Sequence, residues 1–145
     1  MRLVRYLGTL LVLGAALAVP AHAATGPTIT GGGSADDMTR FALAISGGTG
    51  HFECLMPAVM TVEATVTGVT VTSATTATFT GVAAVTLAAH TEFGPPGPIA
   101  RDASFTTNVT AGGPGTGFVD LTITMMGTTM EFAGTVEHGQ INVSP

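Results

Sequence analysis

Four side chains in the middle of the chain carry atoms that bind copper well: His51, Cys54, Met56 and Met60. Imidazole, thiolate and thioether groups are soft ligands that suit this metal. Residues 51–56 nevertheless alternate as a β-strand does, and neighbouring strand positions point to opposite faces. His51 and Cys54 are three positions apart, so we expect them on opposite faces. The pattern favours a buried stripe of Phe52, Cys54 and Met56, with His51 facing solvent.

Other groups of side chains could also hold a ligand, and each has a simpler structural interpretation. The histidines that would have to complete a copper site are His90 and His138. The methionines that cluster beside an expected turn are Met125, Met126 and Met130. The hard oxygen donors that could bind calcium are Ser34, Asp36 and Asp37. Methionine also fills irregular gaps in cores, and adjacent acids without the spacing of a calcium loop are weak ligands. We therefore expect no metal site and no cofactor.

Nucleophilic catalysis needs a serine or cysteine beside a base that a third group orients. The chain has no G-x-S-x-G motif, and three histidines follow residue 23. Cys54 is the single cysteine, so no disulfide can form within the chain. Free cysteine is among the most buried residue types. We expect no catalytic residue, no enzymatic activity and a buried thiol.

Charge and aromatic content exclude several kinds of partner. After residue 23 the chain has two basic residues, Arg40 and Arg101, against nine acids, which gives a formal charge of −7. Phosphate neutralisation needs many lysines and arginines, so we expect no nucleic-acid binding. The chain has no Trp, and its one Tyr is Tyr6. The lack of these rings counts against a site that stacks sugars.

The first 23 residues have the pattern of a cleavable secretory signal. Arg2 and Arg5 precede an apolar run over 7–19, and Ala21-His22-Ala23 ends the segment. A basic start, a short apolar stretch and an A-x-A site are typical of such signals. The apolar run is shorter than the roughly 20 residues that a membrane-spanning helix needs. We expect a secreted, periplasmic or extracellular protein with no stable membrane insertion after cleavage.

The remaining chain predicts an all-β domain. Thr and Val are abundant and alternate with other residues, which suits pleated strands. Glycines and prolines interrupt these runs every 8 to 12 residues or so, a spacing typical of a sandwich or barrel. The expected strands cover 38–46, 51–56, 60–72, 76–89, 104–110, 118–125, 129–136 and 140–143. We predict seven to nine antiparallel strands in a flattened barrel or sandwich. In this scheme 24–37 is a flexible, Gly-rich lead-in and 38–145 is one domain, with kinks at Gly68 and Gly81.

Several segments resemble, in the same order, the post-choice-of-anchor type of domain of secreted bacterial proteins. The segments are GGGS at 31–34, RFALAISGGTGHFEC at 40–54, TATFTGVAAV at 76–85, DLTITMMG at 120–127 and, after Gly134, HGQINV at 138–143. The resemblance implies a secreted antiparallel β domain and no catalytic residue. An acidic loop that often reads Asp-Asn-Gly in that family is AGGPGTGFV here, and this departure from the family pattern counts against a metal role for the loop.

These observations together predict a non-catalytic β domain with a structural or binding role in the cell envelope or the extracellular space. Its partner would be an unidentified protein or surface. An alternative is a carrier of a small apolar ligand, if the sheet closes around a cavity. A metal-binding exported protein is a further alternative, less favoured by the residue inventory.

Overall fold

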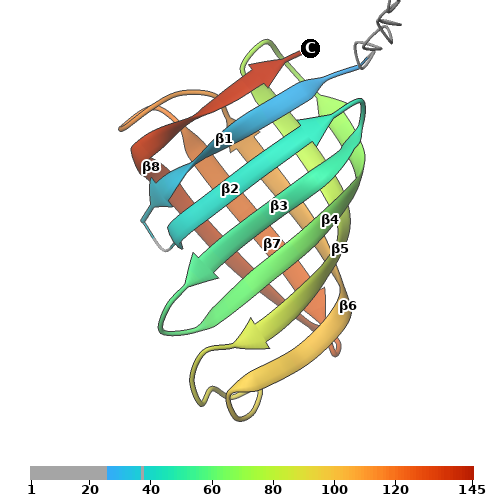
Figure 1. Ribbon diagram of the computed structural model, residues 1–145, viewed down its shortest axis with the longest axis vertical. Helices are drawn as coiled ribbons and strands as arrows, with labels where there is room; N and C mark the ends of the chain where they lie inside the picture. Colours follow the sequence, from blue (N-terminus) through green and yellow to red (C-terminus); the bar gives the residue numbers. More distant parts are fainter. Residues whose placement is uncertain (1–25, 37) are drawn as a thin grey trace, which may run out of the picture.

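The computed structural model describes residues 26–36 and 38–145, and these residues form a closed antiparallel barrel. Each strand pairs with the next in the chain, and β1 pairs with β8 to close the barrel (Figure 1). The strands are β1 (Thr28–Ala35), β2 (Met38–Ser46), β3 (Thr49–Met56), β4 (Met60–Val71), β5 (Thr76–Leu87), β6 (Gly97–Thr110), β7 (Phe118–Met125) and β8 (Thr128–Ser144). The predicted all-β class, the antiparallel barrel and the strand number are confirmed.

Alternation along the strands separates an apolar interior from a polar outer face. In β4, for example, Val62, Ala64 and Val66 are buried, whereas Glu63 and Thr65 are exposed. Because successive strand residues point to opposite faces, one pattern supplies both the core and the outer surface. Burial of the apolar face drives formation of these Thr- and Val-rich strands.

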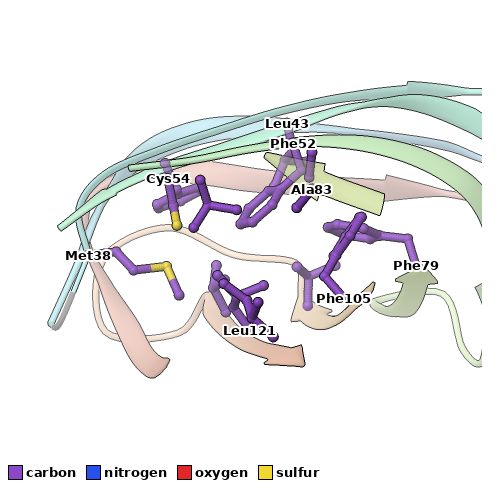
Figure 2. Close-up of a cluster of buried hydrophobic side chains, with 14 of the residues drawn as sticks. Met38, Leu43, Phe52, Cys54, Phe79, Ala83, Phe105 and Leu121 are labelled. Atoms are coloured by element: carbon purple, nitrogen blue, oxygen red, sulfur yellow. The ribbon is translucent and has the colours of Figure 1, made fainter. Parts of the chain in front are cut away.

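The interior is filled by side chains from all eight strands. The rings of Phe52, Phe79 and Phe105 pack against one another inside the barrel, with centroids 5.5 to 6.3 Å apart. Figure 2 shows these rings with Leu43, Cys54 and Leu121 in one cluster. Eight strands enclose an interior just wide enough for side chains to fill or for one small ligand. Here the phenylalanine rings occupy that space.

Two hairpins use tight two-residue turns with positive φ. Gly47 and Gly48, between β2 and β3, have φ of 61° and 88°, and Met126 and Gly127, between β7 and β8, have φ of 50° and 78°. Turns of this kind match the right-handed twist of the strands they join. Met126 is the non-glycine residue that the second turn forces into the left-handed region.

The seam between β1 and β8 depends on glycine. Gly33 lies opposite Gly139, whose φ is 86°, and a Cβ on Gly139 would lie 1.9 Å from the carbonyl oxygen of Gly32. Such close backbone approach leaves no room for a side chain, and glycine permits the sharp bend of a barrel corner. In Figure 1, β8 turns at this corner and runs back beside β1.

The expectation of a flexible lead-in over 24–37 is wrong where the structure describes it. Residues 28–35 form β1, which pairs with β2 on one side and β8 on the other. A run of three glycines has no side-chain alternation, so it lacks the usual strand signal. Two backbone ladders nevertheless hold it in the sheet. Residues 24, 25 and 37 lie outside the described residues.

The bounds of other strands also differ from the expectation, most of all in β6 and β8. β6 begins at Gly97, seven residues before the predicted start at 104. The two predicted strands at 129–136 and 140–143 are one strand, β8, which bends at Gly139. The expected kinks at Gly68 and Gly81 coincide with a register shift between β4 and β5.

The predicted signal peptide, 1–23, lies outside the described residues. Within the part of the chain that the structure describes, no helix is long and apolar enough to cross a membrane.

Candidate functional site on the outer face of the barrel

The four candidate copper ligands do not converge. Cys54, Met56 and Met60 point into the barrel and are at most 3% exposed, whereas His51 lies on the outer face. The Nε2–H of His51 donates a hydrogen bond to Oε1 of Glu53, at 3.0 Å. Burial raises the pKa of the Cys54 thiol to about 12, so the thiolate that a metal would need is disfavoured. The predicted split between the two strand faces is confirmed.

Met125, Met130 and Asp36, among the other candidate ligands, have structural roles instead. Met125 is buried, Met130 packs against the core, and Met126 is 67% exposed at its turn. Asp36 accepts a hydrogen bond from the backbone N–H of Thr135, at 2.6 Å. Asp37 lies outside the described residues. Among the residues that the structure describes, no three His, Cys, Asp or Glu side chains gather as metal ligands would.

A hollow of about 570 Å³ lies on the outer face, where β1, β2, β3, β4 and β8 meet; we call it the outer hollow. It is lined by Gly33, Ser34, Arg40, Phe41, Ala42, Glu53, Cys54, Leu55, Thr61 and His138. Its volume falls within the range of about 300–1,000 Å³ that small-molecule sites occupy. Most of its side chains come from outward-facing strand positions.

Small residues on two adjacent strands line the outer hollow. They are Gly33 of β1 and Ala42 of β2, and Ala42 lies opposite Gly32. Longer side chains complete the lining, including Arg40 of β2, Leu55 of β3 and His138 of β8.

Strand register also fixes the polar groups of the outer hollow. Arg40 lies opposite Leu55, and Leu55 lies opposite Thr61, so these three side chains form one row across β2, β3 and β4. Ser34 lies opposite His138 across the barrel seam, with 3.2 Å between Oγ and Nδ1. The β1–β2 register pairs Gly33 with Phe41 and Ala35 with Met38, so Ser34 also lies close to Arg40 along the sheet.

The pairing of Ser34 with His138 is a feature that the sequence did not predict. The two residues are 104 positions apart, and only closure of β1 against β8 brings them together. Once 24–37 is assigned to a lead-in, no pattern in the sequence places Ser34 in a sheet. A serine beside one imidazole nitrogen is not a catalytic arrangement by itself, because no described carboxylate orients the ring.

A second, smaller hollow of about 240 Å³ lies between β6 and β7, beside Asp102 and Met126. It follows from the early start of β6, since residues before Ser104 extend past the end of β7.

Comparison of the chain with protein-family models, with curated proteins and with solved structures finds no significant match.

Proposed function

We propose that the protein is an exported, non-catalytic β-barrel with a structural or binding role in the cell envelope or the extracellular space. The observation that carries this proposal is the contrast between the two sides of the sheet. The interior is occupied by packed apolar side chains, whereas the outer face holds the outer hollow with its polar groups. A ligand or partner would therefore bind on the outside of the barrel.

The packed interior favours this role over the alternative of a carrier with an internal cavity. Phe52, Phe79 and Phe105 are each at most 3% exposed, and their rings contact one another inside the barrel. An apolar ligand could enter only if these rings moved apart. Interiors at crystal-like packing density resist such movement.

The outer face supports a role in an aqueous compartment. Outward positions on β5, β6 and β7 carry Thr80, Thr106 and Thr122 in one row, and Glu131 of β8 continues this row on one side. Transmembrane barrels instead present an apolar band to lipid. The excess of acids over arginines also opposes binding to nucleic acid or to anionic lipid.

The resemblance to post-choice-of-anchor domains belongs to the same proposal. It is supported by the antiparallel fold and by the positions of the similar segments, which fall on β1, the β2–β3 hairpin, β5 and the β7–β8 hairpin. Such a domain would act by binding or by scaffolding.

Export is the part of the proposal that a single experiment tests. The full chain would be produced in a bacterium, and the cell compartments and the medium would be separated. We expect protein outside the cytoplasm whose intact mass corresponds to a start at Ala24. Folded protein that stays in the cytoplasm and retains Met1 would contradict the proposal.

A further inference from the structure

The outer hollow combines an apolar floor with one cation. Leu55 and the small Ala42 present apolar surface, and Gly33 leaves the floor open. Arg40 stands in the same row as Leu55. An apolar surface beside a cation suits an amphiphilic anion, because each part of the ligand meets its own kind of surface.

Arg40 is available to a ligand. Among the described residues it makes no ion pair within 4.0 Å, although it is one of two arginines in a strongly acidic molecule. Glu53, the nearest acid in the lining, is engaged by His51 at 3.0 Å. The guanidinium group has a planar fork of donors that matches a carboxylate in a bidentate geometry.

The surrounding groups favour an anion with a single charge. Glu53 lines the hollow and would repel a second negative charge, and a phosphate dianion usually needs more than one cation. On the seam side, the hydroxyl of Ser34 and the ring of His138 offer further hydrogen-bonding groups. These groups complement a carboxylate better than a phosphate.

We propose that the outer hollow binds small organic carboxylates that have an apolar body, with Arg40 pairing with the carboxylate and Leu55 and Ala42 contacting the apolar part. The inference deepens the proposed function, because it rests on binding at the outer face. It names Arg40 as the residue that selects the charge of the ligand.

The test is a titration of the exported protein with sodium octanoate, followed by two-dimensional amide and methyl NMR. We expect saturable shifts at Ala42, Leu55 and neighbouring amides. Neutral octanamide should bind at least tenfold more weakly, since it lacks the charge that Arg40 recognises. Arg40→Gln should weaken octanoate binding by at least tenfold and leave octanamide binding unchanged.

Two further variants sharpen the test. Arg101→Gln removes the same charge from β6, outside the outer hollow, so it should leave octanoate affinity within twofold of the parent value. Glu53→Gln should tighten octanoate binding several-fold, because it removes a repulsive charge from the lining.

The results that would contradict the proposal fall into two groups, one against the ligand and one against the outer face as the binding site. Equal affinity for octanoate and octanamide, equal effects of Arg40→Gln and Arg101→Gln, or no saturable shift below about 10 mM would overturn the ligand assignment. Shifts confined to inward-facing residues such as Val62 and Ile123 would instead contradict binding at the outer face, and with it the proposed function.

Discussion

At the scale of single residues, burial decides the chemistry of Cys54. Its side chain is 2% exposed and lies among apolar neighbours, as Figure 2 shows. The charged thiolate is poorly solvated there, so the pKa rises from 9.0 to about 12. Both access and ionisation therefore protect the thiol in the folded state.

We expect Cys54 to resist a thiol reagent in native protein at pH 8 and to react at once in protein unfolded by urea. Rapid labelling of the folded protein would refute this prediction.

The raised pKa of Cys54 also links the stability of the protein to pH. Below pH 9 the thiol is neutral in both states, and between pH 9 and 12 the unfolded chain ionises first, so stability falls as pH rises. Urea unfolding at pH 8 and pH 10 measures this loss, and Cys54→Ala should lose less. An equal loss of stability in Cys54→Ala would contradict this link to pH.

Thr107 is the polar residue buried inside the barrel, and its hydroxyl has no hydrogen-bond partner among the described residues. A buried hydroxyl without a partner costs free energy because it has lost its bonds to water. Thr107→Val keeps the branched shape and removes the hydroxyl, so we expect the free energy of unfolding to rise by about 1 kcal/mol. Urea unfolding measures the change. Thr106→Val, at a position on the outer face, is the matched control; a destabilised Thr107→Val variant would contradict this account.

At the scale of elements, the β7–β8 turn holds a residue poorly suited to it. Met126 has φ of 50° and is 67% exposed, so it bears backbone strain without packing in return. Asn populates this region more readily than other residues with side chains. We expect Met126→Asn to stabilise the protein by about 0.5–1 kcal/mol in thermal or urea unfolding. Met126→Ala keeps the strain and should not gain this stability; equal effects of both variants would argue against turn strain.

The seam contains a side chain that replaces a missing ladder bond. The β1–β8 register shifts at Ala35, and the Asp36 carboxylate accepts a bond from the N–H of Thr135 close by. We expect Asp36→Ala to lower the free energy of unfolding by about 1–2 kcal/mol, because the N–H loses its charged acceptor. Asp102→Ala removes an exposed acid from β6 and should change stability little. Equal stability of the two variants would show that the seam does not need Asp36.

The elements that the sequence could predict are those with strong alternation. Both β2 and β7 match the predicted ranges residue for residue, since their apolar and polar positions alternate and Gly-rich segments or turns bound them. The β1 strand was missed because Gly31, Gly32 and Gly33 have no side chains from which a period can be read. The sequence predicts two strands in place of β8 because the alternation is interrupted near Gly139, where the strand bends.

For the candidate site, the sequence predicts which possible metal ligands stay apart, but it does not predict where the outer hollow lies. Strand alternation was enough to separate His51 from Cys54 and to argue against copper. The outer hollow depends on which strands become neighbours, and that information is not local. Arg40 and Leu55 meet through a hairpin, but Ser34 and His138 meet only when the barrel closes.

At the scale of the whole molecule, closure of the barrel is the claim on which the rest depends. Closure packs the interior, on which the proposal of binding at the outer face rests, and it also brings β8 beside β1 at the outer hollow. The closing ladder pairs Ile29 with Val143 and Gly31 with Ile141. An open sheet would leave β1 unpaired with β8 and expose the apolar face.

The most direct test of closure is a nuclear Overhauser measurement across the seam in isotopically labelled protein. We predict backbone contacts between Thr28–Ala35 and the last part of β8, including Ile29 with Val143, together with slow amide exchange in β1. Contacts of β1 with β2 alone, or fast exchange throughout 28–35, would contradict a closed barrel and the outer-face site built on it.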